Sequence, residues 1–204
     1  MKAEGILMVL SGPSGAGKGT VCRALLEKQP GIHLSISATT RKPRAGEVDG
    51  VNYFFVSREK FQQMVDAGEL LEWAEVYGNY YGTPLKAVKD ALARGEDVLL
   101  EIDVQGGLQV KKKFPSAVLV FLLPPSRAVL VERLTGRGTD SAEEIQRRLH
   151  WANTELGFLK RYDYVVINRQ VEEAVATLQA IILAEKCRPQ RLKIDKSWGN
   201  LSDL

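Results

Sequence analysis

A glycine-rich stretch that directly follows a short apolar run limits the folds open to this chain more than any other feature. The run Gly5–Leu10 leads into Gly12-Pro-Ser-Gly-Ala-Gly-Lys-Gly-Thr20, where Gly12, Gly17 and Lys18 have the spacing G-x-x-x-x-G-K. This order predicts a buried strand, a tight turn and a helix that begins near Lys18. Glycines let successive N–H groups converge on one anion, and the helix N-terminus adds positive charge. The alternative, a glycine-rich turn with an incidental lysine, fits the combined pattern less well.

The stretch is therefore predicted to bind the phosphates of ATP, with Lys18 reaching the β and γ phosphates. The predicted contacts are the nine loop residues Gly12, Pro13, Ser14, Gly15, Ala16, Gly17, Lys18, Gly19 and Thr20. Position 19 departs from the usual motif, in which a Ser or Thr hydroxyl follows the lysine and meets magnesium. Here the hydroxyl comes one residue later, so Thr20 is a candidate Mg²⁺ ligand whose direct coordination stays open. Gly-Lys-Gly-Thr resembles the loop of adenylate kinases, which favours a nucleotide kinase.

The composition fits one globular domain. The 204 residues are 45% hydrophobic and 26% charged, and the net charge of +3 is too small a surplus to indicate a nucleic-acid partner. No apolar run approaches the about 20 residues of a membrane span, and the N-terminus lacks a signal-peptide layout. Cys22 and Cys187 have no metal or redox spacing and are expected to be reduced thiols, with a disulfide as the weaker alternative. We expect a cytoplasmic protein that binds neither nucleic acid nor membrane.

Apolar strands alternate with amphipathic helices along the chain. Strand patterns cover residues 5–10, 32–36, 53–56, 70–76, 98–106, 117–123 and 164–168. Helical patterns cover residues 18–29, 57–68, 84–93, 108–113, 128–134, 143–159 and 171–186. This alternation behind a phosphate loop predicts a three-layer α/β fold with a parallel sheet. Segment 77–83, a tight run of tyrosines and glycines, suits a wall of a ligand site, with packed tyrosines as the alternative, and the polar tail 187–204 is expected to be loosely attached beyond Pro189.

Three further features carry candidate site residues. Segment 37–44 combines three cations with hydroxyls, which suits an anion site, although charge alone favours a solvated loop. Glu72 lies in an apolar strand, where an ionised carboxylate needs a partner unless the strand turns it to solvent. Asp103 ends another apolar strand, two residues after Glu101, at the edge where parallel sheets bind ligands. Asp103 is thus a second candidate Mg²⁺ or substrate ligand, with a helix N-cap as the alternative.

A glycine hinge flanked by arginines precedes the helical pattern at 143–159. Such a segment can fold as a lid over a triphosphate and bring Arg137 and Arg148 to the transferring phosphoryl group. A helix with a solvated basic face is the alternative, and the presence of a phosphate loop favours the lid.

Several spaced motifs occur in one order along the chain. They are Ser37-x-x-x-Arg41-x-x-Arg44, Gly46-Glu47, Tyr53-Phe-Phe, Glu72-Trp-Ala, Tyr80-Tyr-Gly-Thr83, Glu101-Ile-Asp-Val-Gln-Gly106 and Arg133-x-x-x-Arg137-Gly-Thr. With them the chain resembles guanylate kinase from about Gly5 to Lys186. The resemblance implies a P-loop core of residues 1–35 and 88–186, an inserted GMP-binding subdomain of residues 36–87 and a helical lid at about 135–158.

The resemblance also implies a reaction and the residues that perform it. ATP would phosphorylate GMP, and dGMP as well, with Mg²⁺ as cofactor and with domain closure. The GMP phosphate would be held by Arg41, Arg44, Tyr53 and Tyr81, and guanine would be read by Ser37, Glu72, Thr83 and Asp103. The catalytic residues would be Lys18, Arg41, Arg137 and Arg148, while Arg133 and Asn168 would lie on the adenine side.

Two other functions stay open. Guanylate-kinase-like domains also serve as catalytically inactive modules that bind phosphorylated partners, and those modules lack a working phosphate loop. A related kinase with another acceptor, such as AMP or a phosphorylated ribose, could use the same scaffold. Intact Gly12, Gly17 and Lys18 favour an enzyme over the first, and Glu72 with Ser37 favours guanine over the second. The sequence predicts no oligomeric state.

Overall fold

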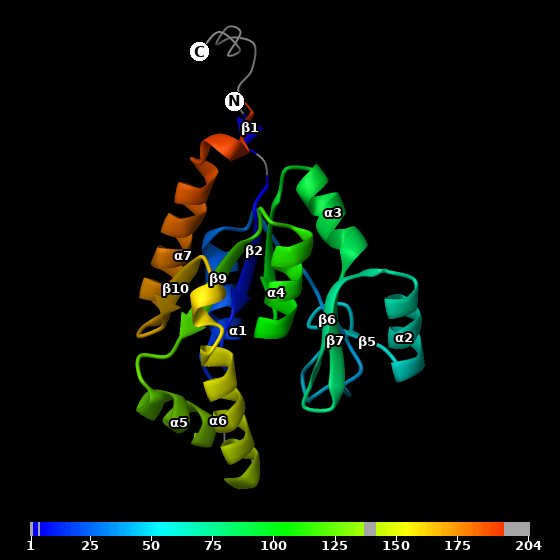
Figure 1. Cartoon of the computed structure of the whole chain (residues 1–204), viewed down its shortest axis with the longest axis vertical. Coiled ribbons are helices and arrows are strands. Elements are labelled where there is room, and N and C mark those ends of the chain that lie inside the picture. The colour runs from blue at the N-terminus through cyan, green and yellow to red at the C-terminus, as the bar shows by residue number, and fades with distance from the viewer. Residues whose placement is uncertain (1, 4, 137–141, 194–204) are drawn as a thin grey trace, which may run out of the picture.

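The centre of the molecule is a five-stranded parallel sheet, seen in a computed structural model that describes residues 2–3, 5–136 and 142–193 (Figure 1). The strand order is β10-β9-β2-β8-β3, so β2 is the middle strand. The strands are β2 (Leu7–Ser11), β3 (Ile32–Leu34), β8 (Asp97–Glu101), β9 (Val118–Leu123) and β10 (Tyr164–Ile167). The chain proceeds from β2 to one side of the sheet and later returns to the other side at β9. Ligands bind parallel sheets at such a reversal, beyond the carboxyl ends of the strands.

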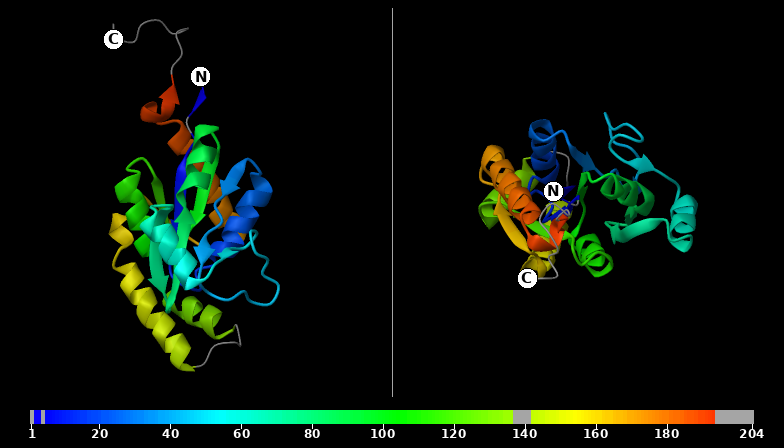
Figure 2. Two further views of the ribbon diagram at one scale, coloured as in Figure 1. Left: turned by 90° about the vertical axis from the view of Figure 1, so that its right-hand side faces the viewer. Right: turned by 90° about the horizontal axis from the view of Figure 1, so that it is seen from above.

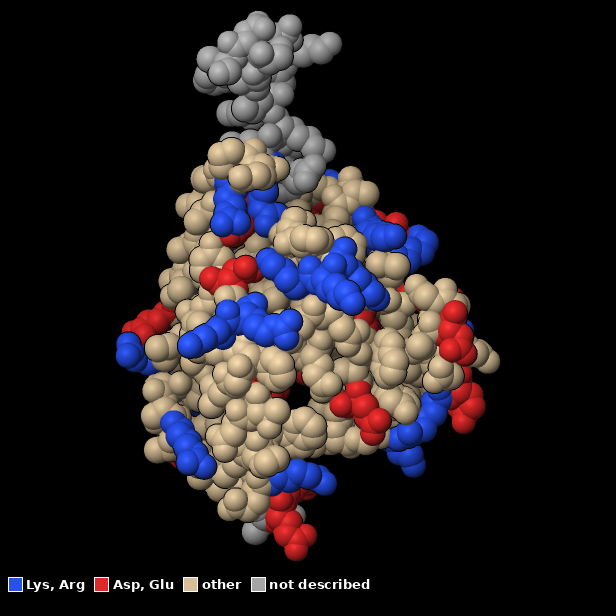
Figure 3. All heavy atoms as spheres, viewed as in Figure 1, with Lys and Arg blue, Asp and Glu red and all other residues tan. Residues whose placement is uncertain are grey.

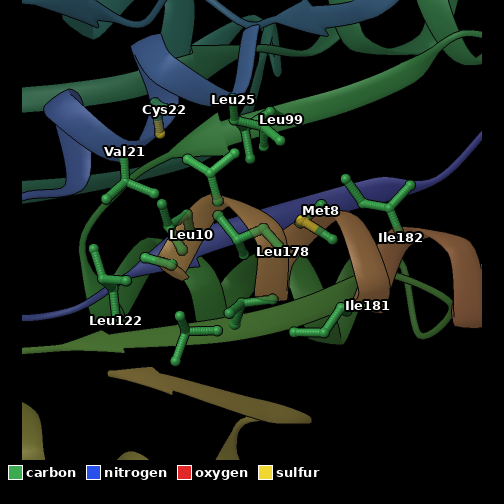
Figure 4. Packing of buried hydrophobic residues seen from close by; sticks show 14 of the residues in the cluster. Met8, Leu10, Val21, Cys22, Leu25, Leu99, Leu122, Leu178, Ile181 and Ile182 are labelled. Carbon is green, nitrogen blue, oxygen red and sulfur yellow. The ribbon is translucent and has the colours of Figure 1, made fainter. Parts of the chain in front are cut away.

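Helices cover both faces of this sheet, as Figure 1 shows. The helices are α1 (Lys18–Lys28), α2 (Arg58–Asp66), α3 (Leu85–Ala93), α4 (Val104–Lys113), α5 (Arg127–Thr135), α6 (Ala142–Leu156) and α7 (Val171–Lys186), with short 3-10 helices η1 (Leu159–Arg161) and η2 (Pro189–Arg191). Met8 and Leu10 of β2 pack in one cluster with α1 and α7 (Figure 4). Leu7 and Val9 pack in another cluster with α3 and α4. Burial on both faces explains the continuous apolar strands and confirms the predicted three-layer α/β fold.

A second, smaller sheet lies to one side of the core together with α2, as the view from above in Figure 2 shows. Its strand order is β5-β4-β7-β6, and its strands are β4 (Ala38–Thr39), β5 (Phe54–Phe55), β6 (Leu70–Val76) and β7 (Asn79–Pro84). Most of segment 77–83 forms β7, which pairs antiparallel with β6. The reversal occurs at Tyr77 and Gly78, whose φ angles of 51° and 77° suit a tight hairpin turn.

The predicted strand at 98–106 is confirmed in its first half, but the prediction is wrong for its second half. The strand β8 ends at Glu101, and α4 begins at Val104, four residues before the predicted helix. Helix propensity does not predict a helix through Gly106 and Gly107, because glycine is unfavourable in helix interiors. Packing requires both glycines, because a Cβ would come 2.3 Å from Glu72 Oε2 at Gly106 and 2.7 Å from the Tyr162 hydroxyl at Gly107. The predicted strands at 32–36 and 53–56 are likewise shorter in the structure.

The first part of the C-terminal tail is attached rather than loose. Strand β11 (Leu192–Lys193) pairs antiparallel with β1 (Lys2–Ala3). Arg191 donates to Glu185, a buried carboxylate of α7, and to the carbonyl oxygen of Ser116. Residues 194–204 lie outside the described residues. Cys22 is buried and Cys187 exposed, and both are free, so the weaker disulfide expectation is wrong.

Candidate active site

The glycine-rich loop runs from the end of β2 to the start of α1, as predicted. Its conformation requires glycine at two points that bring it close to other elements. At Gly12, with φ of 148°, a Cβ would lie 2.2 Å from the carbonyl oxygen of Leu122. At Gly17, with φ of 93°, a Cβ would lie 2.5 Å from Asn168 Nδ2. Any side chain at either position would therefore displace the loop from β9 or from the end of β10.

The Lys18 ammonium group lies over the loop. Its Nζ donates to the carbonyl oxygen of Gly12 at 2.5 Å and to that of Pro13 at 3.3 Å. The helix α1 begins at the same residue. The positive end of a helix and a cation therefore lie at one place, which is an arrangement that favours binding of a phosphate group.

A cleft of about 210 Å³ connects this loop with the second sheet. Its lining residues are Ser14, Lys18, Ser37, Tyr53, Glu72, Ala74, Val76, Tyr77, Tyr81, Glu101, Ile102, Asp103 and Glu155. Lys18 thus shares one cavity with most of the residues predicted to contact GMP. These residues come from four separate parts of the chain, so only the folded structure brings them together.

Glu72 lies buried at one end of the cleft, with 3% of its surface exposed. Its Oε1 accepts a hydrogen bond of 2.6 Å from the hydroxyl of Thr83, which faces it across the β6–β7 pair. The pKa of Glu72 is raised to about 7, mainly by burial; the Thr83 hydrogen bond opposes this rise and the nearby Asp103 carboxylate adds to it. The solvent-facing alternative is therefore wrong, and one carboxylate oxygen is turned toward the cleft side of α4.

Arg41 is held by an acidic side chain to which the sequence assigned no role. Its two terminal nitrogens donate to the carboxylate of Glu47 at 2.9 and 2.8 Å, and its guanidinium lies 5.4 Å from the Tyr53 ring centroid. The rings of Tyr53 and Tyr81 are 5.9 Å apart. The structure therefore groups three of the four residues predicted to hold the GMP phosphate. The fourth, Arg44, is exposed. Of the four, Tyr53 and Tyr81 line the cleft, whereas Arg41 and Arg44 do not.

A second cavity, of about 460 Å³, opens on the other side of the loop. It is lined by Gly15, Gly17, Thr20, Arg133, Gly136, Asn168, Arg169 and Val171. Arg133 and the buried Asn168 both donate to the carbonyl oxygen of Ala16, at 3.3 and 2.8 Å. Arg133 also donates to the Asn168 carbonyl oxygen at 3.1 Å. The two residues predicted for the adenine side thus brace the loop and border this cavity.

The two candidate metal ligands lie apart. Thr20 borders the second cavity, whereas Asp103 borders the cleft and caps α4 by accepting from the Gly106 N–H at 2.7 Å. The N-cap that the sequence disfavoured is therefore present. Glu101 is closer to the loop, since a Cβ on Gly19 would lie 3.5 Å from its Oε1. Within the described ranges, no group of three or more His, Cys, Asp or Glu side chains is arranged to hold a metal ion by itself.

The helix α6 closes one side of the cleft and packs on α5 through Leu149 and Ala152. Arg148 lies with its guanidinium 6.0 Å from the Tyr77 ring centroid, while Arg137 falls outside the described residues. The sequence did not single out Glu155, which lines the cleft from α6. Burial raises the pKa of Glu155 to about 7, and Lys18 opposes this shift.

Comparison with known proteins agrees with this geometry. A sequence model of the family described as guanylate kinase matches residues 4–185. The chain belongs to the guanylate kinase family. A guanylate kinase of Caldanaerobacter subterraneus subsp. tengcongensis is 56% identical over 193 residues, covering 95% of this chain and 94% of that protein. One of Halalkalibacterium halodurans is 54% identical over 191 residues, with 94% of each chain covered.

The fold agrees as well. The crystal structure of a guanylate kinase from Anaplasma phagocytophilum superimposes with a TM-score of 0.79 at 36% identity, covering 94% of this chain and 91% of that one. The resemblance inferred from the motifs is therefore confirmed at the level of the family. Among the helices that the structure describes, none is both long and apolar enough to cross a membrane. The cytoplasmic location stays a prediction.

Burial of Glu72 leads to a pH dependence of stability in this guanylate kinase family member. Between about pH 4.5 and pH 7 the native carboxyl keeps a proton that the unfolded chain releases, so the unfolding free energy falls as the pH rises through this window. Glu155 titrates in the same window and acts in the same direction. Replacing Glu72 with Gln removes its share. The fall in unfolding free energy between pH 5 and pH 8 should therefore shrink by about 2 to 3 kcal/mol, at about 1.4 kcal/mol for each unit of pKa shift that is titrated in this window.

Urea unfolding at the two pH values measures this difference. The matched control is Glu75→Gln, the same change at an exposed residue of the same strand. A decline that is equally steep in Glu72→Gln and in the unsubstituted protein would contradict the burial argument.

Proposed function

We propose that this chain transfers the γ-phosphoryl group of ATP to GMP, forming ADP and GDP. The observation that carries the proposal is a shared cleft: Lys18 of the phosphate loop lines the same cavity as the buried Glu72, which Thr83 hydrogen-bonds. Further support comes from relatives at 50–56% identity that are named guanylate kinase. The products follow from moving one phosphoryl group between two nucleotides.

Recognition of guanine rests on Glu72 in this proposal. Guanine presents two neighbouring donors, N1–H and the exocyclic amine, and one carboxylate can accept from both. Adenine has an acceptor at N1 and no amine at the neighbouring carbon, so it would leave a buried carboxylate without partners, which a polar site rejects strongly. Ser37, Thr83 and Asp103 supply further polar contacts to the base. Since these contacts involve base and phosphate rather than the sugar, dGMP is proposed as a second acceptor.

The GMP phosphate is proposed to lie against Arg41, Tyr53 and Tyr81, with Arg44 reaching it from the segment between β4 and β5. A guanidinium and phenolic hydroxyls together suit a phosphate group, because they provide several donors and one fixed charge. Glu47 already orients the Arg41 guanidinium between aromatic rings. The arginine is therefore pre-organised, which lowers the entropy lost on binding.

The ATP phosphates are proposed to lie on residues 12–20, with Mg²⁺ held mainly by those phosphates, water and the Glu101 or Asp103 carboxylate. These residues fit such an ion, which usually takes one or two carboxylates and keeps several waters. When bound, Mg²⁺ neutralises charge on the phosphates. Lys18 stabilises the transferring group from the loop side, and Arg148 approaches it from the lid helix (α6) on closure. Arg137, which precedes α6 in the sequence, is proposed as a second arginine at this group. Closure also excludes water, which limits hydrolysis of ATP.

The test is a coupled assay of ADP release with ATP and Mg²⁺, comparing GMP, dGMP, AMP, CMP and UMP as acceptors. We expect turnover with GMP and dGMP and at least about a hundredfold lower kcat/KM with the other three, the discrimination typical of a hydrogen-bonding site. Comparable turnover with AMP would favour a related kinase with another acceptor. A folded protein that binds GMP and turns over no acceptor would favour the inactive binding module.

A further inference from the structure

Tyr77 occupies a backbone conformation that suits other residues better. It is the one non-glycine residue with a positive φ, 51°, in the part of the chain that the structure describes. Together with Gly78, at φ of 77°, it forms the turn of the β6–β7 hairpin. In such two-residue turns Asn-Gly is the preferred pair, and a bulky aromatic residue at positive φ is an outlier. Strain of this kind persists where the side chain has a use.

The Tyr77 ring contacts three side chains of the lid helix. The Trp151 ring meets it edge to face, with centroids 6.4 Å apart and planes at 83°. The guanidinium groups of Arg147 and Arg148 lie 5.7 and 6.0 Å from its centroid, within the range of cation–π attraction. These contacts bring the turn of the hairpin next to α6. An aromatic ring on the second sheet therefore holds two arginines of the lid helix.

This contact bridges a hollow rather than a packed interface. A cavity of about 210 Å³ separates the lid helix from α4 and the hairpin, and both Tyr77 and Trp151 line it. Figure 3 shows a hollow near the middle of this face, between α6 and the hairpin. Because few side chains fill the gap, the ring contact contributes a large share of the attraction between the two parts.

We propose that Tyr77 is a positioning residue that holds the lid helix, and with it Arg148, against the second sheet during phosphoryl transfer. Glu72 and Tyr77 lie on the same strand and its turn, five residues apart. A base bound at Glu72 thus fixes the strand that carries the contact to Arg148. The inference rests on the proposed function for the role of Arg148, whereas the ring contact itself is independent of it.

A different use of the ring is to contact the acceptor, because Tyr77 also lines the nucleotide cleft. The two uses predict different kinetics. A ring that binds GMP directly would change KM for GMP, whereas a ring that positions Arg148 would change kcat with little effect on that KM.

Two substitutions test the proposal. Tyr77→Asn removes the ring and its contacts with α6 but leaves a residue that the turn accepts. Relief of the backbone strain at the turn should offset the lost contacts, so the urea midpoint should change little. The kcat of this variant should fall by about tenfold, because two cation–π contacts and one aromatic pair are lost. Its KM for GMP should stay within about twofold of the value for the unsubstituted protein. Tyr77→Phe keeps the ring and should retain kcat within about twofold.

Three kinetic results would overturn the proposal: unchanged kcat in Tyr77→Asn, a loss confined to KM, or a Tyr77→Phe variant as slow as Tyr77→Asn. A lower urea midpoint in Tyr77→Asn would also overturn it, by making the ring a structural contact.

A second readout needs no turnover. The chain has three tryptophans, so Trp73→Phe with Trp198→Phe leaves Trp151 as the sole indole fluorophore. Adding ADP with GMP should change its emission, and Tyr77→Asn in this background should reduce the change by at least about half, since the ring contact is lost. An identical change in both proteins would refute the contact. Absence of GMP phosphorylation by the unsubstituted protein would refute the proposed function alone and leave this signal interpretable.

Discussion

Replacing Lys18 with alanine is expected to lower kcat with ATP and GMP by at least about a hundredfold, the loss typical when one preorganised charged donor is removed from a transition state. The ammonium group lies over the loop, within 2.5 Å of the Gly12 carbonyl oxygen, where the phosphates of ATP are proposed to bind. Phosphoryl transfer depends on neutralising charge as it spreads over the phosphate oxygens. The lost cation therefore acts on the chemical step.

The matched control is Lys28→Ala, the same change at the exposed C-terminal end of the same helix. It should retain kcat within about twofold, as expected for a surface change far from the loop. Binding of GMP, measured by calorimetry, should survive in Lys18→Ala, because Glu72 and Arg41 are untouched. A Lys18→Ala enzyme that keeps more than a fifth of the original kcat would contradict the role given to this residue.

Local rules predicted the phosphate loop because every part of it lies within one short stretch. The apolar strand, the glycine spacing, the lysine and the helix start are neighbours in sequence, and each has a conformational reason that needs no distant partner. The same holds for α7, whose predicted bounds of 171–186 agree with the structure. Alternation of strands and helices then predicted the three-layer fold.

The composition of the cleft depends on distant pairings that local rules do not reveal. The β6–β7 register sets Thr83 opposite Glu72, and that register follows from a turn at Tyr77 that carries no aspartate or asparagine signal. Glu155 reaches the cleft only because α6 folds back over it. Glu47 was visible within a motif, but its pairing with Arg41 could not be read from spacing alone. The roles of the predicted site residues stay predictions.

Glu72 carries opposing consequences for stability and for selectivity. Burying a carboxylate is unfavourable, and its pKa of about 7 reflects that penalty in the protein without ligand. A base that donates two hydrogen bonds relieves the penalty, whereas a base that donates none leaves it in place. The unfavourable burial in the free protein therefore increases the difference in affinity between guanine and adenine.

Replacing Glu72 with Gln should accordingly lower the ratio of kcat/KM for GMP to that for AMP by about a hundredfold or more, as removal of a buried hydrogen-bonding partner implies. The amide turns one acceptor into a donor, so it faces the guanine donors unfavourably, yet its N–H can donate to adenine N1. Activity with GMP should fall and activity with AMP should rise.

Steady-state assays with both acceptors measure this ratio, and the matched control is Glu75→Gln, which makes the same chemical change on the same strand at an exposed site. The control should keep the original ratio within about twofold, because surface substitutions have small effects. Thr83→Val offers a second comparison, since it removes the hydroxyl that donates to Glu72 at 2.6 Å and leaves the carboxylate in place. If Glu72→Gln retains the discrimination between GMP and AMP, the base is read by other residues of the cleft, and Ser37 and Asp103 become the first candidates.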